Sequence, residues 1–438
     1  MTTRYWIGGA TANTQTGTVT PANVESTDVF TMTFTEEDGS STVAIAFTAT
    51  AATVGNVTAG LTAALNASDD PIVKGRVTAA DDTTHVTLTT DTAGQPFYVA
   101  CTTADGGGND TQTLTWAETL ASIGPYDWNV AVNWSGGAVP VNTDDVLVED
   151  NALDILYGLD QSAVTLDSLK VSKDFLASLG QADYPLTVNI TAAGAVWVGY
   201  YYGSGSPVGP DRVNLDLQTS QCAIEVFDSN ASSDGSLDPV RLVVTHASTT
   251  LIVHKGRVGV ASQKSGQTSQ LTTIFVGYVA SQNSDSKVNV GPGVTLGTFK
   301  QTGGTNVLQK SASTLVQVEG GFLSIVGSQA VTAVTCTGGV VSYDSTGAIT
   351  TLNVGADAKV YLDRSGTVTT VSLAGELDMR RSSSARTITN LEVYSGAKLY
   401  MNEDNVTTTN GIDLHEADIS DVTLILGKDY RVTLGAIA

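Results

Sequence analysis

The sequence predicts a mainly β protein, in which a small N-terminal α+β domain is followed by a parallel β-solenoid. The first observation is a short phrase that recurs at residues 330–336, 348–354, 367–373 and 387–393. Aligned on one apolar position, the copies lie 18, 19 and 20 residues apart, and that position holds Val331, Ile349, Val368 and Ile388. Within each copy apolar residues alternate with Thr, Ser, Asn or Glu, as in a strand with one buried face. A regular period built from short strands predicts a coil that stacks turn on turn.

Paired glycines are the second observation. The pairs Gly303-Gly304, Gly320-Gly321 and Gly338-Gly339 lie 17 and 18 residues apart, each just after an alternating segment. Glycine tolerates a positive φ, so it suits the corner at which a solenoid strand bends into the next face. An antiparallel sandwich is the alternative, but it predicts frequent Asn-Gly or Asp-Gly turns, and this segment has almost none. The solenoid is therefore the favoured fold.

Composition restricts the partners of this chain. Only 15% of its 438 residues are charged, against about a quarter in typical globular proteins. Its 21 basic and 44 acidic residues give a net charge of −23. Because phosphate binding depends on clustered Lys and Arg, we expect no nucleic acid partner. The same charge disfavours an anionic membrane surface, so no membrane partner is expected.

The three cysteines are Cys101, Cys222 and Cys336, and their spacing fits neither a zinc site nor a disulfide framework. Cys336 fills the slot that Val354 and Leu373 fill in later copies, which predicts a small buried hydrophobe. No cofactor is expected, and assembly in a reducing cytoplasm fits this pattern. The N-terminus lacks the features of a secretory signal, and no segment has the length of a transmembrane helix.

Residues 1–124 are predicted to form an N-terminal α+β docking domain. Strand-like alternation occurs at 28–34, 43–47, 86–88 and 96–99. Between them, Val54, Val57, Leu61 and Leu65 form one apolar stripe at helical spacing, with Thr53 as a plausible N-cap. Two strand pairs around one helix describe a compact domain.

Aromatic residues mark the next two regions. Residues 125–150 form a Trp/Gly-rich cap and linker, in which Trp128 and Trp134 either cap the end of the solenoid core or anchor a partner. Residues 151–438 are assigned to the solenoid, although a strand of solenoid character begins within 142–148. Further along, Trp197 stands beside Tyr200, Tyr201 and Tyr202. Such aromatics either form a contact between subunits or stack on sugar rings, and the subunit contact is favoured.

The sequence gives only weak indications of catalytic or metal-binding residues, so no enzymatic activity is expected. Asp344, Asp363 and Asp378 recur at nearly the solenoid period and could bring two carboxylates together on adjacent rungs. Because the aspartate recurs in rung after rung, solvent-facing turn residues are the favoured interpretation. His246 and His254 form only a weak metal pair. The loop 105–110 suggests a hairpin tip rather than a calcium site.

Two phrases in the first 150 residues resemble structural proteins of tailed bacteriophages: Trp6 to Ala10, and Phe47 to Val54 with its continuation. A third, Asn133 to Pro140 followed by Asp144 to Val146, resembles the lead-in to β-helices in phage and in some bacterial surface proteins. The resemblance implies a non-enzymatic capsid cement or decoration protein. Such a protein is made in the host bacterial cytoplasm and lies on the capsid surface of the virion. It docks on the major capsid protein, projects a rigid β-helix and is often a homotrimer. A tailspike or tail fibre that binds, or also cleaves, host polysaccharide and a bacterial surface adhesin remain alternatives.

Overall fold

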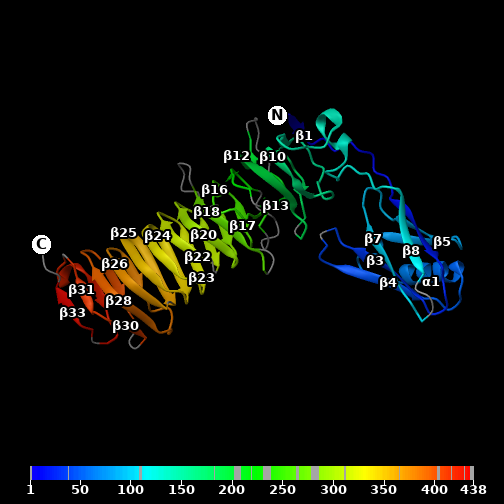
Figure 1. The fold of residues 1–438 in the computed structure, drawn as a ribbon. Helices are drawn as coiled ribbons and strands as arrows, with labels where there is room; N and C mark the ends of the chain where they lie inside the picture. The colour runs from blue at the N-terminus through cyan, green and yellow to red at the C-terminus, as the bar shows by residue number, and fades with distance from the viewer. Residues whose placement is uncertain are drawn as a thin grey trace. The chain divides into compact units, whose positions relative to one another are not determined.

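The computed structural model describes residues 2–37, 39–107, 111–181, 183–201, 209–218, 220–229, 238–262, 266–277, 286–309, 312–364, 366–401, 405–415, 417–428 and 430–434. The chain folds as two compact units, which we call the N-terminal unit and the solenoid unit (Figure 1). The N-terminal unit comprises residues 4–139 and 153–159, and the solenoid unit comprises residues 140–152, those from 160 onward and the first residues of the chain. The observed boundaries differ from the predicted ones because residues 153–159 return to the N-terminal unit.

The N-terminal unit contains two antiparallel sheets and one α-helix. The four-stranded sheet has the order β5-β6-β2-β8 and consists of β2 (Thr16–Ala22), β5 (Val77–Asp81), β6 (Val86–Thr90) and β8 (Thr113–Leu120). The three-stranded sheet has the order β4-β3-β7 and consists of β3 (Val29–Thr35), β4 (Thr42–Thr48) and β7 (Tyr98–Ala104). Helix α1 spans Val54–Asn66 with Thr53 at its N-cap, as predicted. The four expected strands are present, and the four-stranded sheet contains three further strands, β2, β5 and β8.

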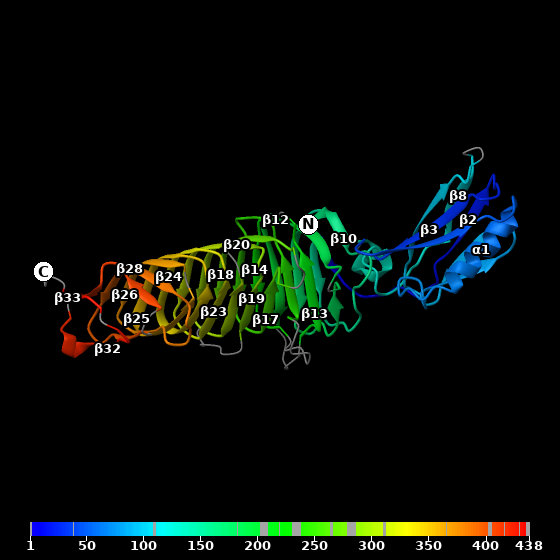
Figure 2. The same ribbon diagram turned by 90° about the horizontal axis from the view of Figure 1, so that it is seen from below.

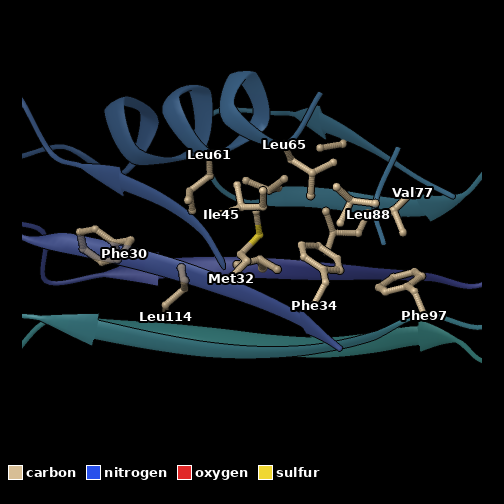
Figure 3. Close-up of a cluster of buried hydrophobic side chains, with 14 of the residues drawn as sticks. Phe30, Met32, Phe34, Ile45, Leu61, Leu65, Val77, Leu88, Phe97 and Leu114 are labelled. Atoms are coloured by element: carbon tan, nitrogen blue, oxygen red, sulfur yellow. The ribbon is translucent and has the colours of Figure 1, made fainter. Parts of the chain in front are cut away.

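A single apolar core joins the helix to both sheets, as Figure 3 shows. Val57, Leu61 and Leu65 are buried on one side of α1, which confirms the predicted stripe. Met32 and Phe34 extend into the same core from alternate positions of β3. Gly60 allows the helix to approach β4, because a Cβ at this position would overlap the ring of Phe47.

The solenoid unit is a parallel β-solenoid, as predicted, and its strands stack in chain order from one end of the unit to the other (Figure 2). Most strands pair in parallel with the strand one turn further along. The strands are β9 (Asp145–Val148), β10 (Asp160–Ser172), β11 (Ser178–Leu179), β12 (Leu186–Tyr200), β13 (Arg212–Asp216), β14 (Ala223–Val226), β15 (Val240–Val243), β16 (Thr250–Val253), β17 (Arg257–Val260), β18 (Ser269–Val276), β19 (Lys287–Val290), β20 (Val294–Gln301), β21 (Thr305–Gln309), β22 (Ala312–Val318), β23 (Phe322–Gly327), β24 (Val331–Ser345), β25 (Ile349–Arg364), β26 (Thr367–Leu373), β27 (Glu376–Asp378), β28 (Arg386–Val393), β29 (Lys398–Tyr400), β30 (Val406–Thr408), β31 (Ile412–Leu414), β32 (Thr423–Ile425) and β33 (Val432–Leu434).

Two continuous ladders of paired strands form most of the solenoid wall. The first ladder contains β9, β10, β12, β14, β16, β18, β20, β22, β24, β25, β26, β28, β31 and β33. The second ladder contains β11, β13, β15, β17, β19, β21, β23, the second parts of β24 and β25, β27, β29 and β32. The long strands β24 and β25 belong to both ladders because they continue around a corner. The first ladder begins at β9, so the solenoid starts before the predicted residue 151.

The predicted register of the repeat is confirmed. Val331 pairs with Ile349, Ile349 with Val368, and Val368 with Ile388, so the aligned residues stack directly on one another. The spacing between β24 and β25 grows by one residue, and a register shift after Cys336 takes up the extra residue as a local bulge. Cys336 is fully buried, as expected of a residue in the apolar slot, and burial raises the pKa of its thiol to about 11.

The glycine pairs form the predicted corners. The second glycine of each pair has a positive φ: 82° at Gly304, 75° at Gly321 and 75° at Gly339. A Cβ at Gly339 would lie 2.5 Å from the carbonyl oxygen of Gly321 on the preceding rung. Neither the backbone angle nor the space suits another residue, which explains the spacing of these glycines.

Gln301 and Asn306 are two of the buried polar residues of the solenoid, each with 0% of its surface exposed. Gln301 Nε2 donates to the carbonyl oxygen of Gly320 at 2.8 Å, and Asn306 Nδ2 donates to Gln301 Oε1 at 2.9 Å. Asn306 Oδ1 accepts from the backbone N–H of Val288 at 2.8 Å. These buried amides are satisfied within the wall, so they stabilise the stack rather than open it.

Candidate functional site

The tryptophans predicted to form a cap are buried in the N-terminal unit, in a cluster separate from the apolar core around α1. Trp128 and Trp134 have 0% and 1% of their surface exposed. The Trp134 ring packs edge-on against Trp128 at 4.5 Å and against Trp6 at 5.1 Å, and its Nε1 donates to the carbonyl oxygen of Trp128 at 2.7 Å. The two side chains are enclosed by their own chain and leave almost no surface for a partner. The presence of Trp6 in this cluster could not be read from local sequence.

An aromatic patch lies on the outer side of the first ladder. We define it as Trp197, Tyr200, Phe227 and His254, with Lys170 beside them. In the ladder Lys170 pairs with Trp197 and Trp197 with Glu225, so Lys170 and Trp197 occupy equivalent outward positions on adjacent rungs. Phe227 and His254 directly follow the ladder strands β14 and β16. The patch therefore spans four consecutive rungs.

The rings of this patch contact one another in sequence. Trp197 meets Tyr200 and Phe227 edge-on, with centroids 6.3 Å apart in each pair. Phe227 stacks on His254 at 5.1 Å with planes inclined by 19°. The Lys170 ammonium lies 4.5 Å from the centre of the Trp197 ring, a cation–π contact. Such packing holds the rings rigidly, which lowers the entropy cost of binding another surface.

The predicted interface tyrosines differ in their surroundings. Tyr200 is 7% exposed, and its hydroxyl donates to Glu149 Oε2 at 3.0 Å. Tyr201 is half-buried, and Tyr202 lies outside the described residues. Trp197 is half-buried and belongs to the exposed side of the ladder. The structure therefore brings Trp197 and Tyr200 together, and it adds Phe227 and His254, which sequence analysis missed.

The charges around the aromatic patch are paired. His254 Nε2 lies 2.7 Å from Glu225 Oε1, and Lys173 Nζ lies 2.6 Å from Asp228 Oδ2. Lys255 Nζ lies 3.5 Å from the same Asp228 oxygen. In a chain of net charge −23, this gives a region of balanced charge around the partly exposed aromatic patch. A second copy of the chain could approach here with less electrostatic repulsion than elsewhere.

The three recurring aspartates do not form a stacked column, so that prediction was wrong. Asp344 pairs in register with Arg364, and Tyr361 pairs with Asp378. The carboxylates bind guanidinium groups instead of facing one another: Asp344 binds Arg364 at 3.1 Å, Asp363 binds Arg381 at 3.4 Å, and Asp378 binds Arg380 at 2.8 Å.

The environment of two of these aspartates also corrects the turn interpretation. Asp363 and Asp378 are only 7% and 5% exposed, so they are not solvent-facing corner residues. Hydrogen bonding to Arg380 lowers the pKa of Asp378. A carboxylate held ionised by a neighbouring guanidinium is a poor general acid at neutral pH.

The same arginines form a second cluster on the second ladder, which the sequence did not reveal. Arg381 lies over the Tyr361 ring at 4.2 Å, and Arg380 lies over the Tyr400 ring at 4.2 Å. Lys359 also approaches Tyr361, at 4.6 Å from its ring centre. Their alignment follows from the register of the ladder, in which Asp378 separates the two tyrosines.

The histidines serve local contacts. His246 Nδ1 accepts from the backbone N–H of Ser248 at 3.2 Å, whereas His254 belongs to the aromatic patch. Among the described residues, no group of three His, Cys, Asp or Glu side chains is placed to hold a metal ion. In the predicted loop 105–110, residues 108–110 lie outside the described part. Within the described ranges, no helix combines the length and apolar character needed to cross a membrane.

No known protein family matches this chain, and no curated protein or solved structure matches it. Its function is therefore inferred from the solenoid, the aromatic patch and the charged clusters.

Proposed function

We propose that this chain is a non-enzymatic structural protein of a tailed-bacteriophage virion, a capsid cement or decoration protein. Its N-terminal unit would dock on the major capsid protein, and its solenoid would project from the capsid surface. The observation that most supports this proposal is the continuous ladder of strands from β9 to β33, which encloses a buried and mostly apolar interior. A continuous parallel solenoid is rigid because each rung is hydrogen-bonded to both neighbours.

The carboxylates on the solenoid also favour a structural role. Asp344, Asp363 and Asp378 are each bound to an arginine, so none of them is paired with another carboxylate for acid–base hydrolysis. The acidic surface keeps a protein dispersed at the high local concentration of a virion shell.

We further propose that the protein is a homotrimer whose subunits meet at the aromatic patch. Half-buried tryptophan and phenylalanine side chains held in rigid contact, such as Trp197 and Phe227, are typical of interface centres. Substituting Trp197→Ala should convert the trimer to monomers, measured as molar mass by light scattering after size-exclusion chromatography. Phe322→Ala, which removes a 36% exposed aromatic from the second ladder, is the matched control and should remain a trimer. A monomeric parent protein, or a trimeric Trp197→Ala variant, would contradict this assignment.

Immunogold electron microscopy of phage lysates tests the proposed location. Antibodies raised to this protein should decorate particle heads in a regular pattern. Gold at the tail tips would favour the second candidate, a tailspike or tail fibre that binds host polysaccharide. That candidate is favoured by the half-buried, outward-facing Trp197, because aromatic rings also stack on sugars. Label on cell envelopes alone would contradict a virion role.

A further inference from the structure

The aromatic patch occupies one end of a longer outward surface on the first ladder. From β12 to β28, ten strands of this ladder pair in register, and alternate residues of each strand point outward. These outward residues stack into two columns, one from Trp197 to Glu392 and one from Ala195 to Asn390. We call the surface that the two columns form the ladder face.

One column of the ladder face contains no charged residue. Its ten members, in ladder order, are Ala195, Ala223, Thr250, Thr273, Thr298, Leu315, Ala333, Thr351, Thr370 and Asn390. The second ladder differs, because its outward residues Lys359, Glu376 and Lys398 are charged and follow one another in register. An uncharged column of this length allows another surface to pack closely without burying an unpaired charge.

The other column carries apolar side chains, and few of its residues are charged. Ile252 and Phe275 stand at outward positions on adjacent rungs and are half-buried. Lys300 Nζ is neutralised by Glu319 Oε1, which lies 2.7 Å away. Beyond Lys300 the column is uncharged until Glu392 on the last of these strands. The ladder face therefore combines apolar surface with little free charge along its length.

The aromatic patch alone is too small for a stable contact between subunits. Rungs are about 4.8 Å apart and alternate residues about 7 Å apart, so four rungs offer a footprint of about 15 Å by 10 Å. A specific interface buries about 800 Å² on each partner. The ten strands of the ladder face extend over about 43 Å, which brings the footprint to about 430 Å². The longer surface thus supplies area that the patch lacks.

The charge of the chain indicates which partner this face suits. A partner of positive charge would be attracted to the acidic surface of a chain whose net charge is −23. A second copy carries the same negative charge, so the two copies can meet closely only where charged residues are few or paired. The ladder face meets this condition, whereas the charged outward residues of the second ladder do not.

We propose that the subunits contact one another along the whole ladder face, from the aromatic patch to β28, with their solenoids side by side. The proposal rests on the homotrimer proposed above, and it adds a contact surface far from the patch. All three solenoids would point in the same direction, because rotation about a three-fold axis keeps the direction of each subunit along that axis.

Substituting Thr351→Lys tests the contact seven rungs from Trp197, about 34 Å along the ladder. The ammonium would be buried between subunits, so the protein concentration at which half of the trimer dissociates should rise at least tenfold. Sedimentation velocity of the full chain over a range of concentrations measures this change. Ser324→Lys is the matched control, because Ser324 is also half-buried and outward but belongs to the second ladder, and it should dissociate as the parent protein does.

A cysteine variant provides a second test that adds no charge to the face. Thr351→Cys, treated with a bifunctional maleimide, should give covalent dimers and trimers, because equivalent rungs meet near the three-fold axis. The Ser324→Cys variant and the parent protein are the controls, since Cys101 is half-buried and sets the background of the reaction. Both should stay at that background.

The outcomes separate this contact from the contact at the aromatic patch. A Thr351→Lys variant that stays trimeric, or a Thr351→Cys variant that cross-links no more than the parent protein, would overturn the extended contact and leave the patch in place. Dissociation caused by Thr351→Lys but not by Trp197→Ala would support the ladder face and contradict the assignment to the patch. A monomeric parent protein would overturn both.

Discussion

Gly339 occupies a corner where backbone angle and space both exclude a side chain. Its φ is 75°, and a Cβ would lie 2.5 Å from the carbonyl oxygen of Gly321. Gly339→Ala should therefore lower the apparent melting temperature of the solenoid. The left-handed conformation alone costs about 1–2 kcal/mol in a residue with a Cβ, and the overlap with the preceding rung adds about 1–3 kcal/mol.

Gly396 provides the matched control, because it has a φ of 83° but no described atom lies within 4 Å of the point that a Cβ would occupy. The Gly396→Ala variant should therefore lose stability only through the cost of the left-handed backbone conformation. Differential scanning fluorimetry of both variants separates the two effects. Equal decreases in melting temperature would show that contact with the preceding rung adds no cost at Gly339.

Glu37 should make the N-terminal unit less stable at alkaline pH. Its Oε1 accepts from the backbone N–H of Gly158 at 2.9 Å, while Oε2 is buried without a partner in the described residues. Burial raises the pKa of Glu37 from 4.5 to about 8, and the nearby carboxylates of Asp127 and Glu36 add to the increase. The folded chain thus retains a proton that the unfolded chain releases. Its contribution to stability is complete below pH 4.5 and is lost as the pH rises through about 8.

Substituting Glu37→Gln should reduce the fall in melting temperature of this unit between pH 5 and pH 8, because the amide cannot ionise. Part of the fall should remain, since burial also raises the pKa of Asp127. Asp69→Asn removes the same charge from a side chain that is 87% exposed. The melting temperature of this control should depend on pH in the same way as that of the parent protein. A Glu37→Gln profile that matches the parent profile would contradict this assignment.

At the scale of single residues, sequence pattern was reliable where position alone decides burial. Cys336 is buried because every residue in its slot faces the interior. Phe322 is 36% exposed, whereas its neighbours Leu323 and Ile325 are buried. It follows the corner glycine directly, so strand alternation places Leu323 inward and Phe322 outward.

At the scale of elements, Arg386 holds the segment between β27 and β28 against the solenoid. The side chain is 1% exposed, and its Nη1 donates to the carbonyl oxygens of Leu362 at 2.6 Å and Met379 at 2.8 Å. Its Nη2 donates to the carbonyl oxygen of Ser382 at 2.6 Å. Without this guanidinium the carbonyl groups of Leu362 and Met379 lose this donor, each at a cost of about 1–3 kcal/mol. The Ser382 carbonyl still accepts from Asn405 Nδ2 at 3.0 Å.

Substituting Arg386→Ala should therefore open this segment locally while most of the solenoid stays folded. Trypsin should then cleave after Arg380 or Arg381 at least tenfold faster than in the parent protein, measured by mass spectrometry of the fragments. Arg364→Ala is the control, because its side chain is 56% exposed and its surface ion pair with Asp344 contributes little. Unchanged cleavage of the Arg386→Ala protein would exclude the anchoring role.

The repeat made the last rungs predictable, whereas irregular elements were not. The register of β24, β25, β26 and β28 follows from alternation and period alone. Strand β2 was missed because its sequence holds a proline and one large apolar residue, Val19, although it is a middle strand of its sheet. The aromatic patch was found in part, because Phe227 and His254 join Trp197 only through the pairing of distant rungs.

At the scale of the whole molecule, the two units have different sources of stability. Each solenoid rung contacts its neighbours, so the solenoid's stability is approximately a sum along the stack. The core of the N-terminal unit instead comes from residues between Val19 and Trp116, which pack around α1 and two sheets. The ends of this segment also meet: the N–H of Asn13 donates to the carbonyl oxygen of Ile123 at 2.9 Å, and the N–H of Ile123 donates to Asn13 Oδ1 at 2.6 Å.

A fragment of residues 13–123 should therefore fold on its own. It retains the whole apolar core and the closing contact between Asn13 and Ile123. We expect well-dispersed amide resonances and a cooperative thermal transition. A fragment of residues 24–123 is the control, because it lacks β2, which pairs with both β6 and β8, and it should be unfolded.

The fragment of residues 13–123 also tests what raises the pKa of Glu37. It lacks Gly158, the hydrogen-bond donor to Glu37, and the segment that buries this carboxyl group. Once Glu37 is exposed to water its pKa should return toward 4.5, so the melting temperature of the fragment should lack the Glu37-dependent fall between pH 5 and pH 8. A folded fragment that keeps this fall in melting temperature would show that residues 13–123 bury Glu37 without residues 153–159. A fragment 13–123 without a cooperative transition would show that residues outside it complete the core.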